Sequence, residues 1–117
     1  MCLCILAHQL VSTYPNIIAA NREERYDRPT DAPAWQDGVF AGRDGVAGGT
    51  WQGVNPIGLH VALTNRRGDI TDPELRSRGH LCVQALRYAS THAAVDLSHK
   101  LRQTIREQNE RTRKISI

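Results

Sequence analysis

Short apolar runs separated by glycine and proline dominate the first 64 residues of the sequence. The clearest pair of runs covers residues 50–54 and 59–64. Between them, the turn at 55–58 has Pro56 in its second position and Gly58 in its fourth, as a type I turn prefers. Two strand-like runs joined by such a turn form a hairpin, so we expect antiparallel sheet in this part of the chain.

The second strand of this hairpin has an apolar face that ends in an amide. Because side chains alternate along a strand, Leu59, Val61 and Leu63 share one face, and Asn65 falls in line with them. Asn65 is therefore a candidate hydrogen-bond donor at the edge of a core. The alternative is that Asn65 caps the strand end and satisfies the loop that follows.

An earlier hairpin and a set of short strands are also expected. Residues 2–7 and 17–20 are short apolar runs, and 14–16 (Tyr, Pro, Asn) has the composition of a turn between them. The charged stretch 21–31 is expected to be a loop. Residues 37–49 alternate apolar pieces with glycine, which is typical of short strands joined by tight turns.

Helical spacing appears only after the strands. Residues 78–90 have apolar positions on one helical face, with Ser77 as a possible N-cap. A second helical pattern runs from Val95 to Ile105, and polar residues prevail beyond it. Strands followed by helices predict the α+β class with a largely antiparallel sheet.

Composition and charge exclude some functions. With 40% hydrophobic and 23% charged residues, the chain has the composition of a folded protein. Of its 15 Lys and Arg residues, six lie in 100–117 against two Glu, so the net charge of +3 originates in the C-terminal segment. The rest has no basic stripe with interleaved aromatic residues, and we expect no nucleic acid as a partner.

Cysteine usage indicates a reducing compartment. The odd count of three, without a secretory leader, predicts reduced thiols and a cytoplasmic protein. No run approaches 18 consecutive apolar residues, so no transmembrane segment is expected. Cys2, Cys4 and His8 offer soft metal ligands but lack a second pair at zinc spacing, so we expect neither a metal nor a cofactor.

Cys2 is a candidate nucleophile because it directly follows Met1, which is normally removed before a small residue. Removal leaves a thiol and a free α-amine on one residue. The reference pKa of the amine, about 7.7–8.0, lies close to that of the thiol, about 8.5, so the amine can accept the thiol proton near neutral pH. The alternative is that Cys2 is a small apolar residue at the start of a strand.

Up to about Leu86 the chain resembles the NRDE family, also called the transport and Golgi organisation 2 family. The similar segments, in order, are Met1-Cys2, Ala20–Glu24 followed by Arg28-Pro29, Gly48–Asn55, Ala62–Asn65 and Ser77–Leu81. The family name has Asp where this chain has Glu23, a change that keeps the charge and lengthens the side chain.

The resemblance implies a fold and a chemistry. The family is placed with the N-terminal nucleophile hydrolases, which stack two antiparallel sheets between helical layers and whose cysteine members cleave linear amide bonds. By similarity to the penicillin and bile-salt amidase branch, Cys2 would attack the carbonyl and Arg22 would favour the thiolate. Glu24, or else Glu23, would orient the α-amine, and Asn65 would donate to the developing oxyanion. The expected substrate is a small molecule with a linear amide bond.

Members of that family are longer and continue into strands that complete the second sheet. We therefore expect residues 1–99 to form the N-terminal part of such a domain, with an incomplete second half, and 100–117 to form a basic polar tail, helical or disordered. The uncovered sheet is expected to favour a homo-oligomer. Two alternatives are a non-catalytic binding or trafficking protein, related to haem or membrane traffic, and an inactive truncated fragment.

Overall fold

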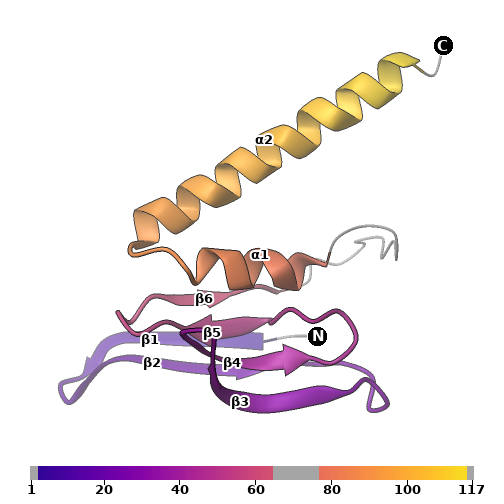
Figure 1. Ribbon diagram of the computed structural model, residues 1–117. Helices are drawn as coiled ribbons and strands as arrows, with labels where there is room; N and C mark the ends of the chain where they lie inside the picture. Colours follow the sequence, from indigo (N-terminus) through magenta and orange to yellow (C-terminus); the bar gives the residue numbers. More distant parts are fainter. Residues whose placement is uncertain (1–2, 65–76, 116–117) are drawn as a thin grey trace.

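The computed structural model describes residues 3–64 and 77–115 and has an α+β architecture (Figure 1). In chain order its strands are β1 (Leu3–Val11), β2 (Tyr14–Asn21), β3 (Thr30–Gln36), β4 (Val39–Asp44), β5 (Gln52–Val54) and β6 (His60–Ala62). The helices α1 (Arg78–Ala85) and α2 (Thr91–Ile115) follow. All strand pairs within the described ranges are antiparallel, which confirms the predicted class.

β1 and β2 form a two-stranded sheet, as predicted, but the turn lies elsewhere. The strands are joined at Ser12 and Thr13, and the predicted turn at 14–16 is wrong because β2 begins at Tyr14. The register of the pair shifts at the level of Pro15. Proline has no N–H to donate, and an irregular edge strand tolerates it.

The second sheet has the strand order β3-β4-β5-β6. β3 begins at Thr30, inside the predicted loop 21–31, and it contains Pro33. Pro33 lies on the edge strand, where the register with β4 shifts between Asp31 and Ala34. The prediction of a loop was wrong for residues 30 and 31 because proline and charged residues are unusual in regular strands. The irregular pairing that tolerates Pro33 cannot be recognised from the sequence pattern.

The predicted hairpin at 50–64 is confirmed as β5 and β6. Gly58 has φ of 83° and donates its N–H to the Asn55 carbonyl at 3.0 Å, which closes the turn. The buried Asn55 side chain donates to the carbonyls of Leu86 and Tyr88, both at 3.0 Å, and accepts from the Leu59 N–H at 2.9 Å. One amide therefore ties the hairpin to the end of α1.

α1 lies on the sheet and covers β5 and β6 (Figure 1). Ser77 accepts from the Gly79 N–H at 3.2 Å, which confirms the predicted N-cap. Cys82 of α1 and Leu86, the C-cap of this helix, are each 1% exposed and face the sheet. The predicted apolar face of β6 is confirmed, because Leu59 is buried and its neighbours on that face pack against this core.

A close backbone contact joins the sheet to the start of α1. The Thr50 N–H donates to the Gly79 carbonyl at 3.3 Å, and Thr50 is buried. A β-carbon on Gly49 would overlap the backbone of Gly79, so only glycine fits there without moving the helix.

α2 contacts α1 and then extends away from the sheets (Figure 1). Ala94, near its start, is buried against Leu59 and Ala85. The helix continues without interruption past residue 99, and the division of the chain at that point stays a prediction. Among the described residues, neither helix is long and apolar enough to cross a membrane.

Candidate functional site

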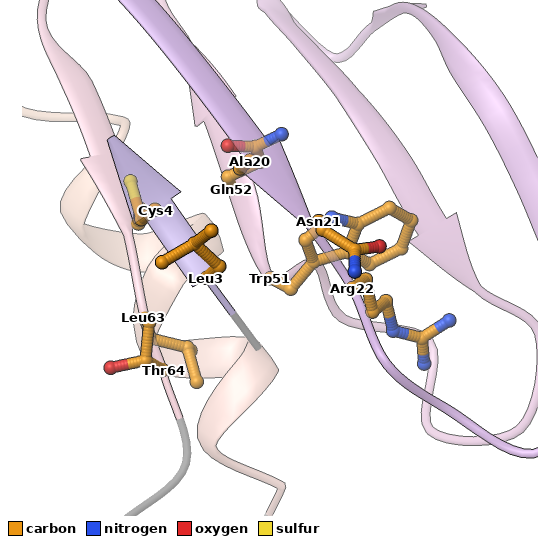
Figure 2. Close-up of a pocket in the computed structure, with 10 residues that line it drawn as sticks. Leu3, Cys4, Ala20, Asn21, Arg22, Trp51, Gln52, Leu63 and Thr64 are labelled. Atoms are coloured by element: carbon orange, nitrogen blue, oxygen red, sulfur yellow. The ribbon is translucent and has the colours of Figure 1, made fainter. Parts of the chain in front are cut away.

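A small pocket lies between the open end of the β1–β2 hairpin and the strands β5 and β6 (Figure 2). Its volume is about 20 Å³, which is room for about one water. A larger molecule would therefore lie over the pocket and not inside it. The described lining residues are Leu3, Cys4, Ala20, Asn21, Arg22, Trp51, Gln52, Ala62, Leu63 and Thr64.

Arg22 is held from several sides. It immediately follows β2, and its guanidinium lies 4.5 Å from the centre of the Trp51 ring, a cation–π contact. Nη1 donates to the Thr30 hydroxyl at 2.7 Å and Nη2 to the Asp44 carboxylate at 2.9 Å. Its side chain is 15% exposed. Figure 2 shows the guanidinium beside Trp51 and directed away from Cys4.

Asp44 is the residue that sequence reasoning missed. Besides Arg22, its carboxylate binds Arg28, with Nη2 at 2.9 Å and Nε at 3.0 Å. Its Oδ1 also accepts the backbone N–H groups of Val46 and Ala47 at 3.0 and 3.1 Å. An aspartate that ends a strand before glycine is a usual turn residue, and that signal indicates the turn but not the two arginines.

The electrostatics of Asp44 favour its charged form. Burial by itself would raise the pKa of this carboxyl group. The hydrogen bonds from Arg28, Ala47 and Val46 and the charge of Arg28 outweigh burial, so the pKa of Asp44 lies below its usual value. In turn, the hydrogen bond that Arg28 donates to Asp44 raises the pKa of Arg28.

Glu24 joins the same group of charges. Its carboxylate lies 3.6 Å from Arg22 Nη2 and 3.8 Å from Arg28 Nε. The structure therefore brings together two of the candidate site residues, Arg22 and Glu24. The set of Arg22, Glu24, Arg28 and Asp44 has two positive and two negative charges and is named here the Arg22 network.

The other two candidate site residues, Cys2 and Asn65, lie outside the described residues. The remaining cysteines differ from each other. Cys4 is an exposed thiol on β1, whereas Cys82 is buried on the sheet-facing side of α1, and burial raises the pKa of the Cys82 thiol to about 12. Cys82 is therefore a core residue without thiolate character near neutral pH.

The Arg22 network offers a hydrogen-bond donor in a fixed orientation, but no uncompensated positive charge. Since Asp44 and Glu24 balance the two arginines, a neighbouring group would experience little net positive potential. Thr30 and Trp51 nevertheless fix the orientation of the guanidinium. A guanidinium that is already oriented donates to an anion at little cost in reorganisation.

Comparison with known proteins places these segments in a family. The sequence model of a family described as Transport and Golgi organisation 2 matches residues 1–113. The chain is 41% identical over 76 residues to the mouse Transport and Golgi organization 2 homolog, covering 60% of this chain and 28% of the relative. It is 38% identical over 81 residues to the human Transport and Golgi organization protein 2 homolog, covering 64% of this chain and 29% of the relative.

The matched part of the chain thus spans less than a third of the length of these relatives. The cattle protein of the same name is also 38% identical over 81 residues. No solved structure matches the chain.

Proposed function

The chain belongs to the Transport and Golgi organisation 2 family, and from this we propose that it carries the apparatus of a cysteine N-terminal nucleophile hydrolase, with the corresponding two-sheet fold. In this proposal Cys2 attacks a linear amide bond of a small molecule in the cytoplasm, after Met1 is removed. Arg22 stabilises the thiolate, Glu24 orients the α-amine, and Asn65 donates to the oxyanion.

The observation that supports the proposal is the position of Arg22. Arg22 follows the last residue of β2, Asn21, which pairs with Leu3, the first residue of β1. In the sequence, Leu3 directly follows Cys2. Leu3 and Arg22 both line the same small pocket. A fixed guanidinium and a neighbouring carboxylate are the groups that a nucleophile with a free α-amine requires nearby.

Labelling with an activated ester, followed by peptide mass spectrometry, tests this proposal. We expect the acyl group on residue 2, with Met1 absent, and complete loss of the label in Cys2→Ala. Cys4→Ala is the matched control and should keep the label, because Cys4 is exposed but faces away from the Arg22 guanidinium. Arg22→Gln should slow labelling by about tenfold, because the thiolate loses one charge-assisted hydrogen bond from the fixed guanidinium.

An intact Met1, or equal labelling of residues 2 and 4, would remove the basis for a nucleophile. Cys82 supplies an internal reference for folding, because a buried thiol with a pKa of about 12 reacts once the protein unfolds. Labelling of Cys82 at the rate of Cys4 would show that the sample is not folded.

A second candidate function is a binding role in membrane traffic or haem handling without catalysis. The names of the relatives, which refer to transport and Golgi organisation, favour the role in membrane traffic. His8 is exposed on β1 with Nδ1 2.7 Å from the Asn16 side chain, and His8 and Cys2 are the residues that would hold haem. A haem absorption band that shifts in His8→Ala, without amide cleavage, distinguishes this role from hydrolysis.

We also propose that the chain self-associates through the β1–β2 hairpin, with a second copy as partner. Apolar side chains on both of its faces are exposed, as the consecutive residues Ile5 at 55% and Leu6 at 64% show. Residues 3–21 contain no Asp, Glu, Lys or Arg, so nothing repels an identical hairpin at the exposed edges.

Sedimentation velocity at micromolar concentration is expected to show a dimer or larger species. Leu6→Lys should shift it to the monomer, because a charged edge strand resists pairing. Ile57→Lys adds the same charge at a similarly exposed position in the β5–β6 turn and should leave association unchanged. A monodisperse wild-type monomer contradicts the proposal.

A further inference from the structure

A second, larger cavity of about 210 Å³ lies between β4 and α1. Val39, Ala41 and Arg43 line it from β4, and their spacing of two places them on one face of the sheet. Val39 and Ala41 pack against Cys82 of α1 and against its C-cap Leu86, so this is the face that the helix covers.

The cavity is separated from the Arg22 network by the sheet itself. Asp44 alternates with Val39, Ala41 and Arg43 along β4 and belongs to the opposite face, and Gly42, whose backbone also borders the cavity, directs its β-carbon position to that opposite face. A β-carbon on Gly42 would lie 2.5 Å from the Trp51 ring, and Asp44 binds Arg22. Any ligand of this cavity would therefore act independently of the proposed nucleophile.

Two arginines line the cavity with their donors unused. Within the described residues, Arg43 of β4 and Arg87, just after α1, form no ion pair and no side-chain hydrogen bond, whereas Arg22, Arg25 and Arg28 are all paired with carboxylates. Arg43 Nη2 lies beside Gly48, 3.9 Å from where a β-carbon would stand. Guanidinium groups with free donors bind carboxylate and phosphate in bidentate geometry.

The other lining residues indicate which groups a ligand would carry besides its anionic group. Val39 is 9% exposed, and with Ala41 and Val83 it supplies an apolar floor. Asp37 also borders the cavity, and its negative charge disfavours a ligand with several negative charges. We infer that this cavity binds a small organic anion, with its carboxylate or phosphate group on Arg43 and Arg87 and a short apolar body on Val39 and Val83.

Titration of the full chain followed by ¹⁵N NMR tests the inference with benzoate, phenyl phosphate and neutral benzyl alcohol. We expect saturable shifts at residues around the cavity with the two anions, with a dissociation constant on the order of 1 mM, and no comparable shifts with the alcohol. Benzoate that binds while phenyl phosphate does not would identify a carboxylate site, and the reverse a phosphate site.

The variant Arg43→Gln/Arg87→Gln should weaken binding by at least about tenfold, since both charged donors are lost. Both residues are exposed and unpaired in the described structure, so folding should be unaffected. Arg102→Gln on α2 removes a charge outside the cavity lining and should bind as wild type does. Anion-induced shifts that persist in the double variant, equal binding of benzyl alcohol, or no shifts near β4 and α1 would each overturn the inference.

Discussion

Replacing Gly49 by alanine is expected to lower the free energy of unfolding by about 3 kcal/mol or more. The new methyl group would overlap the Gly79 carbonyl carbon and approach the Gly79 Cα and the His80 nitrogen to 2.8 Å. These are backbone atoms and cannot rotate away, so α1 must move off the sheet. Urea unfolding followed by circular dichroism measures the change as a lower midpoint at constant slope.

Gly58→Ala is the matched control. Gly58 has φ of 83°, and its β-carbon would meet no atom within 4 Å. Its cost is therefore that of a left-handed backbone alone, about 1 kcal/mol. If both variants lost the same stability, the close contact between the sheet and α1 would not be the cause.

Replacing Asp44 by asparagine is expected to lower the free energy of unfolding by about 3 kcal/mol near neutral pH. The substitution keeps the size of the side chain but leaves Arg22 and Arg28, at 15% and 30% side-chain exposure, with only the more distant carboxylate of Glu24 as a shared anion. Asp27→Asn is the control, because Asp27 pairs with Arg25 at 2.6 Å on the open surface. Solvent screens such a pair, so this change should leave stability nearly unchanged.

The effect of Asp44 depends on pH with a definite sign. Its pKa is lower in the folded protein than the unfolded value of about 3.9. The stabilisation is therefore complete above about pH 4 and is lost as the pH falls through the folded pKa. The difference in stability between wild type and Asp44→Asn should narrow below pH 4, and a difference that stays constant down to pH 2 would contradict this account.

The same substitution connects stability with the proposed chemistry. If Arg22 acts from a fixed orientation, Asp44→Asn should also change the rate at which the thiol at residue 2 is labelled. Unchanged labelling in a folded Asp44→Asn variant would mean that Asp44 stabilises the fold without positioning Arg22.

The sequence correctly predicted those elements that depend on interactions between residues close together in the chain. The turn with Pro56 and Gly58, the apolar face of β6 and the N-cap at Ser77 each depend on residues within a few positions of one another. The errors fall where proline lies inside an edge strand, at Pro15 and Pro33. There the lost hydrogen bond costs little, and a rule that excludes proline from strands fails.

The candidate site likewise contains residues that the sequence predicted and one, Asp44, that it did not. Arg22 and Glu24 were found from their motif, and they are close in the structure because they are close in the chain. Asp44 reaches Arg22 only through the arrangement of two hairpins, 22 residues apart in sequence. Nothing in the sequence around Asp44 distinguishes an aspartate that only forms a turn from one that also binds two arginines.

The sequence by itself determined the helix periods, the turn at 55–58 and the resemblance to the family, because each depends on residues that are neighbours in the chain. Tertiary structure alone decided that Gly49 must lack a side chain, that Asp44 joins Arg22 to Arg28, and that Arg43 and Arg87 face one cavity. The reason is that strand register and helix placement bring distant residues within contact distance, and contact energies act over a few ångströms in space regardless of separation along the chain.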